Sequence, residues 1–504
     1  MIYTRRFMSR MLFICLWACG SGETSETPSA ACASQYVKSE ASWKSMSGAN
    51  TLYIPVDHRP NWYWQEVSKR RGGLEPVSGY EDLWLDRLFA EAQIQILGCS
   101  VHGGRYWEVV LDLPRLFQII RRAARPIFLR LLSRLLVRTD DELNSMDDLP
   151  DVMRLSVCAP QVCDQDLMVD IIVPQFYAPM LMGAKPERKL LNRSFQDVVR
   201  VEELLDWSSI NIDFAIGGTD GCGTSSLHRN LEQHPELAFS TVGEDFFFTA
   251  ELAHRLLPLK SQVESYNTQL EEIKDTKLKS VGFRPKIMGI CNPALFSTGL
   301  ARRKLAGMPN LKMIVILCDP LGRLEKNFME YHYCFDSLAE AKLRGLASGA
   351  RDDEACFASA GSLLSERFGK LKRFWQRREV AVHMPTLMNL FTGRIIVVHQ
   401  EQLRIRPNAV FSSLASFLGA RYTFRSQTSF HRYNSVGGHR TDLCHNATLV
   451  SALKRHLEPE YQMQELLMKD AQELVPESLL LRSTRCDRIA TEEATYCPSR
   501  SACE

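Results

Sequence analysis

The fold is decided by the stretch Asn-Ile-Asp-Phe-Ala-Ile-Gly-Gly-Thr-Asp-Gly-Cys-Gly-Thr-Ser-Ser-Leu, residues 211–227. Its first part alternates apolar residues and predicts a short strand. Four glycines then predict a loop, and Leu227 and Leu231 mark the start of a helix. Such a loop can wrap backbone N–H groups around a phosphate, and the helix N-terminus adds partial positive charge. No Gly-Lys-Ser/Thr closes it, so it is not a Walker A motif, and a plain tight turn would also use these glycines.

Length, charge and cysteine content limit the class of protein. A chain of 504 residues is expected to hold two or three domains. With 45% hydrophobic and 24% charged residues, it has the composition of a globular protein. A net charge of +2 gives no general basic field for nucleic acid. The 15 cysteines favour an oxidising compartment, although some of them are expected to be core thiols.

The N-terminus has the layout of a secretory signal. Three arginines, at positions 5, 6 and 10, precede a short apolar run, and small residues follow it. The run is shorter than the ~20 residues that a membrane-spanning helix needs. We therefore predict a signal peptide or short signal anchor over residues 1–22, and a location in the secretory pathway, either the Golgi lumen or outside the cell. A lipoprotein signal ending at Cys19 and a buried N-terminal helix are the other interpretations.

Residues 23–190 are interpreted as a mostly helical N-terminal region with a cysteine loop. Residues 116–138 carry six arginines among apolar residues, which fits either a helix that contacts a membrane surface or a core helix with a solvated basic face. Cys158 and Cys163 flank Pro160 and predict a local disulfide. Asn192 and Asn446 begin glycosylation sequons, which matter only in the secretory pathway.

Residues 205–470 alternate short apolar runs with helical patterns. The runs predict strands at 286–290, 311–317 and 394–398, and the patterns predict helices at 296–305, 321–335, 381–390 and 407–418. This alternation is typical of an α/β fold in which a central parallel sheet lies between helices, as a three-layer arrangement. Residues 471–504 form a polar tail with three cysteines, which we expect to be held by disulfides of unknown connectivity.

Six landmarks in this region resemble the sulfotransferase family, specifically the Golgi type of the heparan sulfate and carbohydrate sulfotransferases. They occur in the family's order within residues 207–470: 216–227, His234-Pro235, Glu244–Phe248, Gly289–Phe296, Lys312–Phe328, and Val397–Leu403 followed by Phe417–Gly419. The resemblance implies a P-loop-like fold. It also implies the sulfate donor 3′-phosphoadenosine-5′-phosphosulfate and a carbohydrate acceptor.

The resemblance also implies roles for individual residues. The donor's 5′-phosphosulfate would be bound by the loop residues Gly221, Cys222, Gly223, Thr224, Ser225 and Ser226. Arg323, Lys326 and Arg440 would supply positive charge to the donor. Glu244 would be the catalytic base, with its pKa raised by the apolar wall of residues 246–248. Alternatively, Glu244 caps a helix or pairs with an arginine.

The donor site departs from the family pattern. Gly221 stands where a lysine or arginine is usual, and Cys318 replaces the arginine that grips the 3′-phosphate. Ile290 and Cys291 replace a Glu-Lys pair, and Lys326 replaces a serine. Loss of one such cation can cost ~3 kcal/mol of transition-state stabilisation. Residues 302–304, Arg-Arg-Lys, offer further positive charge.

We considered three functions, of which the third agrees least with the sequence. The first is a lumenal sulfotransferase that acts on a hydroxyl or amine of a carbohydrate. The second is a catalytically inactive relative that binds a glycan or a protein. The third, a P-loop kinase, lacks the Walker lysine and a clear magnesium carboxylate. The histidines are scattered without the spacing of metal ligands, so no metal is proposed.

Overall fold

A computed structural model describes residues 27–47, 89, 92–101, 103–112, 152–177, 199–219, 221–252, 255–323, 380–424, 428–431 and 447–469. These residues fall into two compact units, one drawn from 1–54 and 95–203 and the other from 55–94 and 204–504. The signal at 1–22, the basic segment 116–138, both sequons and the tail 471–504 lie outside the described residues. Among the described helices, none is both long and apolar enough to cross a membrane.

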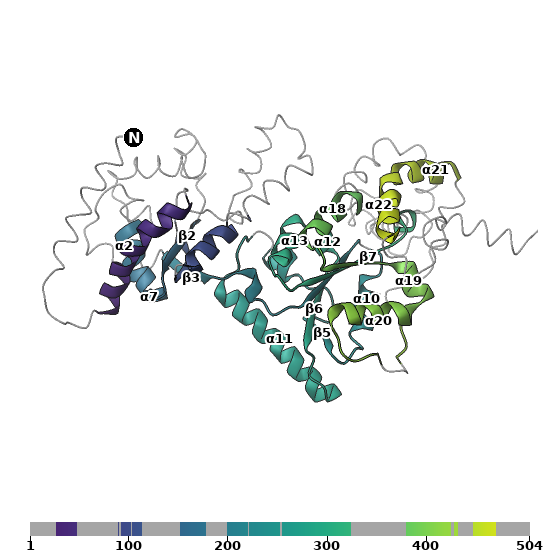
Figure 1. The fold of residues 1–504 in the computed structure, drawn as a ribbon, viewed down its shortest axis with the longest axis horizontal. Helices are drawn as coiled ribbons and strands as arrows, with labels where there is room; N and C mark the ends of the chain where they lie inside the picture. The colour runs from purple at the N-terminus through teal and green to yellow at the C-terminus, as the bar shows by residue number, and fades with distance from the viewer. Residues whose placement is uncertain are drawn as a thin grey trace, which may run out of the picture. The chain divides into compact units, whose positions relative to one another are not determined.

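The N-terminal unit contains a three-stranded sheet of order β2-β1-β3 beside helical segments (Figure 1). The sequence predicted the helical content here, but not this sheet. Strands β1 and β2 pair antiparallel along their whole length. The elements are α2 (Pro28–Ser47), β1 (Gly104–Asp112), β2 (Val152–Pro160), α7 (Gln165–Leu167), the π-helix η3 (Met168–Tyr177) and β3 (Val199–Leu204).

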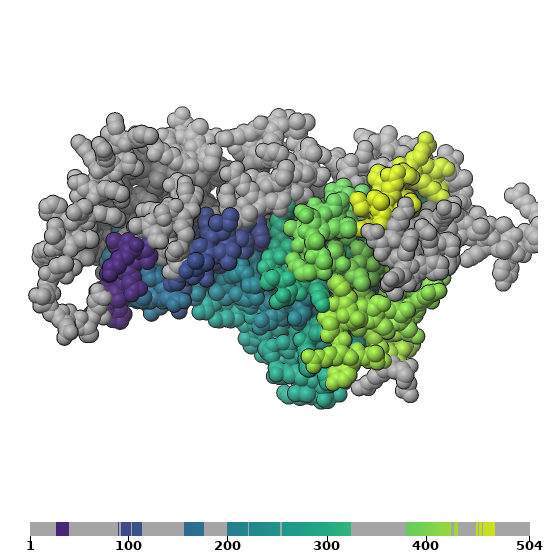
Figure 2. Space-filling model, in the orientation of Figure 1, coloured from purple at the N-terminus to yellow at the C-terminus, as the bar shows by residue number. Residues whose placement is uncertain are grey.

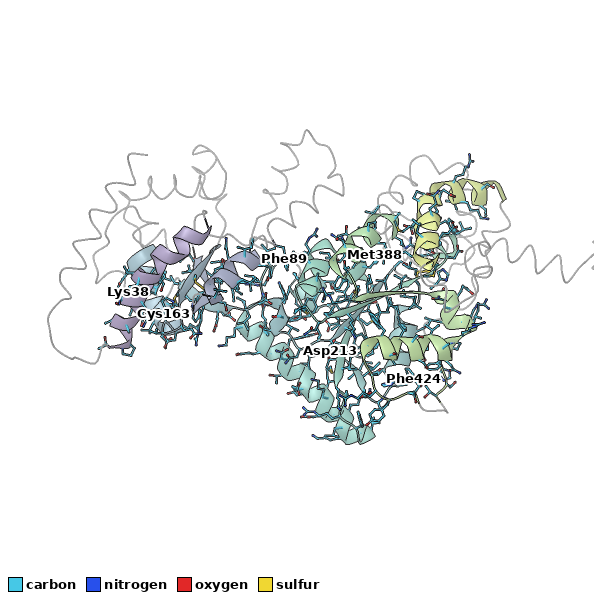
Figure 3. The ribbon with its side chains drawn as sticks, viewed as in Figure 1. Lys38, Phe89, Cys163, Asp213, Met388 and Phe424 are labelled. Atoms are coloured by element: carbon cyan, nitrogen blue, oxygen red, sulfur yellow. A yellow bond between two sulfur atoms is a disulfide. The ribbon has the colours of Figure 1, made fainter. Side chains whose placement is uncertain are left out.

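Two disulfides hold this unit, and they correct one expectation. Cys158 bonds to Cys99, and Cys163 bonds to Cys32. Figure 3 labels Cys163 close to this pair of bonds. The predicted local disulfide between Cys158 and Cys163 is therefore wrong. Cys158 lies in strand β2 opposite Tyr106 of β1. Its sulfur and that of Cys99 both lie next to Gly104, so Cys158 bonds to a cysteine 59 residues away.

The second unit is built on a five-stranded sheet, with the order β5-β6-β4-β7-β8 and every pair parallel. This confirms the predicted α/β class. Three strands match the predicted runs to within about a residue at each end, while β5 was not predicted. The strands are β4 (Phe214–Gly218), β5 (Leu237–Phe239), β6 (Ile287–Cys291), β7 (Lys312–Leu317) and β8 (Ile395–His399).

Helices cover both faces of this sheet, as Figure 1 shows. On one face α10 and α20 share an apolar cluster with β4 and β7, while α12, α13 and α18 lie on the other. α22 packs against α18, and their atoms adjoin in Figure 2. The helical elements are η4 (Trp207–Ser209), α10 (Thr224–Leu231), η5 (Phe247–Glu251), α11 (Lys260–Val281), α12 (Ala294–Ser297), α13 (Gly299–Ala306), α18 (Val380–Leu390), α19 (Gln400–Ile405), α20 (Pro407–Leu418), α21 (Ala447–His456) and α22 (Glu458–Lys469).

One predicted helix has the expected bounds, and another is divided into two. The helix predicted at 407–418 is found with those bounds, because Pro407 opens it and Gly419, at a φ of 88°, ends it. The helix predicted at 296–305 is divided at Thr298, whose extended backbone separates α12 from α13. Most of the helix predicted at 321–335 lies outside the described residues.

Asp213, which Figure 3 labels, directly precedes β4 and binds both strands that flank it, β6 and β7. Its carboxylate accepts a hydrogen bond of 2.7 Å from the Met288 backbone N–H. Its own backbone carbonyl accepts from Lys312, at 2.9 Å. Burial raises the pKa of Asp213, and the Met288 hydrogen bond opposes that rise. These contacts fix the register of β4 against β6 and β7, and with it the position of the loop that follows β4.

The tightest contact in the sheet predicts a destabilising substitution. A Cβ added at Gly289 would overlap the ring of Phe214 on the adjacent strand. We expect Gly289→Ala to lower the free energy of unfolding by about 1–3 kcal/mol, measured by urea denaturation. Gly243→Ala is the control, since a Cβ there meets nothing within 4 Å. Equal stability of the two variants would contradict this packing.

Candidate functional site: the glycine loop and the carboxylate beside it

The carboxyl ends of the parallel strands form one edge of the sheet, where the glycine loop lies. β4 ends at Gly218, and α10 begins at Thr224. Gly221 and Gly223 take φ values of 80° and 101°, a left-handed region that favours glycine. Gly223 caps α10 without any side-chain hydrogen bond. The amide groups of the first turn are therefore not capped by a side chain at that position, which suits an anion.

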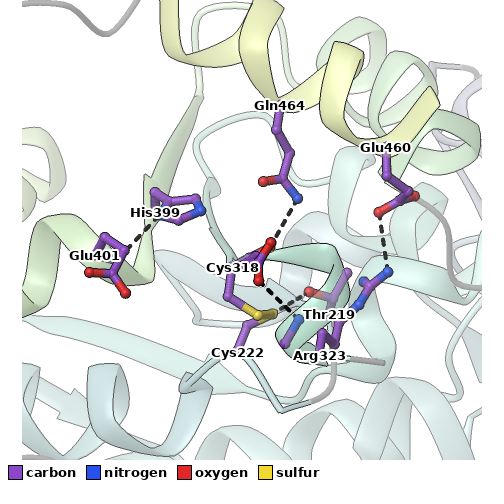
Figure 4. The surroundings of a disulfide bond; sticks show 10 residues. Thr219, Cys222, Cys318, Arg323, His399, Glu401, Glu460 and Gln464 are labelled. Atoms are coloured by element: carbon purple, nitrogen blue, oxygen red, sulfur yellow. Dashed lines mark hydrogen bonds and ion pairs between the residues drawn. A yellow bond between two sulfur atoms is a disulfide. The ribbon is translucent and has the colours of Figure 1, made fainter. Parts of the chain in front are cut away.

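The loop is bonded covalently to the next strand. Cys222 forms a disulfide with Cys318, which directly follows β7, across 96 residues of sequence (Figure 4). The Thr219 hydroxyl lies 2.7 Å from the Cys222 sulfur, and Gln464 donates to the Cys318 carbonyl at 3.1 Å. The disulfide therefore joins two positions that depart from the family pattern, because Cys318 bonds to the residue that follows Gly221. The sequence placed both cysteines at the donor site but gave no sign of their pairing.

The predicted loop residues differ in exposure. Cys222 and Thr224 are buried, whereas Gly221, Gly223, Ser225 and Ser226 are half-buried. The Gln400 side chain reaches the loop as well, because a Cβ built on Gly223 would lie 3.4 Å from its amide nitrogen. Gln400 opens α19 after β8. A neutral amide donor therefore lies beside this loop. Gln400 falls within the landmark 397–403, but the sequence analysis gave it no role.

Arg323 was predicted to contact the donor, and the structure places it in an ion pair. Its guanidinium lies 3.1 Å from the Glu460 carboxylate, with both side chains only 2% exposed (Figure 4). Burial raises the pKa of Glu460, and the Arg323 charge opposes that rise. Lys326 and Arg440 lie outside the described residues. Arg323 does not reach the glycine loop through any described hydrogen bond, so its donor role remains a prediction.

The three basic residues 302–304 lie in α13, on the face opposite α10. All three are buried. Arg302 donates to the Phe296 carbonyl at 2.6 Å. Lys304 donates to the Leu252 carbonyl, and its amine lies 5.3 Å from the centre of the Trp207 ring. Arg302 and Lys304 therefore hold backbone carbonyls and an aromatic ring on the face of the sheet opposite α10.

Glu244 lies at the same edge of the sheet as the glycine loop. The next residue, Asp245, donates its backbone N–H to the Cys291 carbonyl at 2.9 Å, and the Cys291 sulfur lies 3.8 Å from the Thr224 carbonyl. Cys291 therefore joins the Glu244 segment to the first turn of α10. Burial, together with the charges of Glu244 and Asp245, raises the pKa of the Cys291 thiol, which holds it in the neutral form.

The carboxylate of Glu244 has the character expected of a base. Partial desolvation raises its pKa, in the direction predicted from the apolar residues that follow it. Its side chain makes no hydrogen bond or ion pair with any described residue. The adjacent Asp245 accepts a hydrogen bond from the Phe247 N–H at 2.8 Å, at the start of η5. Ser240 and Tyr266 also donate to Asp245.

This chain shows only distant similarity to known proteins. No family model matches the chain, and no curated protein does. The solved structures that it resembles include sulfotransferases. One, from Alicyclobacillus acidocaldarius, shares 18% identity over 51% of this chain and 96% of its own, with a TM-score of 0.34.

Two further solved structures are alike at the same level. Mouse sulfotransferase SULT7A1, complexed with PAP, shares 12% identity over 59% of this chain and 89% of its own, with a TM-score of 0.24. A sulfotransferase domain from the curacin biosynthetic pathway shares 14% identity over 56% of this chain and 97% of its own, with a TM-score of 0.24. At these identities and TM-scores, the likeness fixes neither a residue role nor an activity in this chain.

The disulfide at the loop predicts a stability effect. The double substitution Cys222→Ser with Cys318→Ser opens a covalent loop of 96 residues. We expect it to lower the free energy of unfolding by about 2–5 kcal/mol, measured by urea denaturation without reductant. The wild type in dithiothreitol should move toward the variant. If the variant is as stable as the oxidised wild type, the bond does not constrain the fold.

Proposed function

We propose that this protein transfers a sulfuryl group from 3′-phosphoadenosine-5′-phosphosulfate to a hydroxyl or amine of a carbohydrate. The observation that carries the proposal is the placement of the glycine loop and Glu244 at one edge of the sheet, joined through Cys291. The loop offers backbone donors for an anion, and the carboxylate offers a proton acceptor a short way along the same edge. Both are the parts that sulfuryl transfer needs.

The proposed step balances in charge and atoms. The acceptor oxygen or nitrogen attacks the sulfur, and the bond from sulfur to the bridging oxygen of the donor breaks. The leaving 3′,5′-adenosine bisphosphate keeps that electron pair, and the acceptor proton passes to Glu244. The N–H groups at the start of α10 and the hydroxyls of Ser225 and Ser226 would face the phosphosulfate. The amide of Gln400 would supply a neutral donor at the loop.

A secretory location, in the Golgi lumen or outside the cell, is part of this proposal. Three disulfides are present in the described part of the chain. Such bonds persist in oxidising compartments and are rare in the cytosol. The signal over residues 1–22 and contact of residues 116–138 with a membrane surface remain predictions from the sequence.

A second candidate function is a catalytically inactive protein that binds a glycan or a protein. The specific observations in its favour are the disulfide at Cys318, where the family has a phosphate-binding arginine, and the Glu460 carboxylate that occupies Arg323. Titration with 3′,5′-adenosine bisphosphate by calorimetry separates the two candidates. Binding supports the transferase, and absence of binding supports the inactive relative. Preference for ATP with magnesium would support a kinase instead.

Substitution of the proposed base tests the mechanism. Glu244→Gln removes the proton acceptor but keeps the shape of the side chain, so turnover should be lost while affinity for the bisphosphate stays within about twofold. Glu272→Gln, on the exposed face of α11, is the matched control. The measurement is transfer of radiolabelled sulfate to a glycan panel. Unchanged turnover in Glu244→Gln would remove this residue from the base role.

The pH dependence of the same reaction gives an independent check. Glu244 must be deprotonated to accept a proton, and its pKa is raised by burial. Activity should therefore fall as pH is lowered through a value above the ordinary range of a glutamate. The acid limb of kcat/KM reports that pKa in the free enzyme. An acid limb at or below the ordinary glutamate value would contradict the assignment.

A further inference from the structure

A cavity of about 400 Å³ opens beside Glu244, on the side of the first turns of α11. Its volume falls within the range of small-ligand pockets and suits one or two sugar rings. The lining contains hydroxyl and amide groups that can bind a polyol. The lining residues are Thr241, Glu244, Asp245, Phe246, Phe247, Glu251, Ser261, Gln262, Ser265, Tyr266 and Gln269, all within the described part of the chain.

The charged side chains that line this cavity are all acidic. The lining includes three carboxyl groups and no lysine, arginine or histidine. Asp245 is buried and takes hydrogen bonds from its neighbours, so its role is to hold the loop. Glu244 and Glu251 are exposed and face a molecule that enters. Because the whole chain carries a net charge of +2, this preference for positive charge would be local to the cavity.

An aromatic surface completes the cavity. Phe246 is 52% exposed, an unusual state for a phenylalanine beside two carboxylates. Phe247 stacks on Tyr266, with ring centres 4.0 Å apart and planes 12° from parallel, which fixes the wall behind it. An exposed aromatic ring can lie against the apolar face of a sugar, and it attracts a cation over its own face.

We propose that this cavity binds the acceptor, and that the acceptor is an amine-bearing polyol, a sugar ring with a protonated amine and no sulfate or carboxylate of its own. The identification as an acceptor site rests on the proposed function. Glu251 binds the ammonium group, the serine and glutamine side chains bind hydroxyls, and Phe246 lies against the ring. The attacking group is a hydroxyl of the same sugar, because the protonated nitrogen has no free electron pair, and its one proton passes to Glu244. The same carboxylates repel sulfated and carboxylated glycans.

Binding to the full chain without donor tests this assignment. The probes are glucosamine tetramer, N-acetylglucosamine tetramer and N-sulfated glucosamine tetramer, which differ in charge at one position of each ring. We expect calorimetry at low salt to show at least tenfold tighter binding of the glucosamine tetramer than of the acetylated one, and no binding of the sulfated one. Equal or tighter binding of the sulfated tetramer would overturn the proposal.

Two substitutions locate the effect in the cavity. Glu251→Gln should reduce the tenfold preference to about twofold or less, and Glu251→Lys should give measurable binding of the sulfated tetramer. Glu264→Gln is the control, since Glu264 is exposed on α11 and does not line the cavity. Thermal melting confirms that each variant is folded. A preference that survives Glu251→Gln, or that Glu264→Gln removes equally, would overturn the proposal.

These outcomes are separate from those of the proposed function. If adenosine bisphosphate does not bind but the glucosamine preference is present and depends on Glu251, the transferase fails and the amine site stands as a binding site. If the bisphosphate binds and sulfate is transferred without regard to acceptor charge, the transferase stands and this inference fails.

Discussion

The parallel pairing of five strands is the constraint on which the rest of the structure depends. Since all five run the same way, the residues that follow them gather at one edge. The glycine loop follows β4, Asn292 follows β6, Cys318 follows β7, and Gln400 follows β8. Segments far apart in the sequence thereby become neighbours, and the hydrogen bonds of Asp213 to both strands that flank β4 keep these three strands in register.

At this edge, small contacts relate the loop to the carboxylate. Asn292 donates to the Asp245 carbonyl at 2.7 Å, and Asp245 in turn is held by Tyr266 from α11. The orientation of Glu244 is therefore set by its neighbours in sequence and space, while its own carboxylate stays open to a ligand. Glu244 makes no hydrogen bond to a described residue, whereas the neighbouring Asp245 makes several. This arrangement is expected where one residue reacts and the residue beside it holds the local structure.

Local patterns predicted the elements whose chemistry is local. Short apolar runs identified β6, β7 and β8, because the strands of a parallel sheet covered by helices are apolar along their length. Pro407 and Gly419 fixed the ends of α20. β5 was missed because its three residues are too few to show a period, and its partner β6 decides that it forms at all. The break at Thr298 likewise depends on packing of α12 against the sheet.

The candidate site was predictable where a motif carries it and not where three-dimensional pairing does. The glycine loop and Glu244 were proposed from their order along the chain, and their roles remain predictions. The bond from Cys222 to Cys318 was not, because cysteine positions do not determine connectivity. At Arg323, a motif position predicts a donor contact, and the structure adds an ion pair with a carboxylate from α22. No local pattern near Arg323 announces Glu460, which lies 137 residues away.

The bond between Cys222 and Cys318 has a consequence for how an anion would be received. A flexible glycine loop loses conformational entropy when it closes around a ligand, and that loss subtracts from affinity. Here the ordering is completed during folding, because the loop is fastened to the end of β7 in the absence of any ligand. An anion that bound at this loop would therefore meet donors already in place, and its association would not wait for the loop to rearrange.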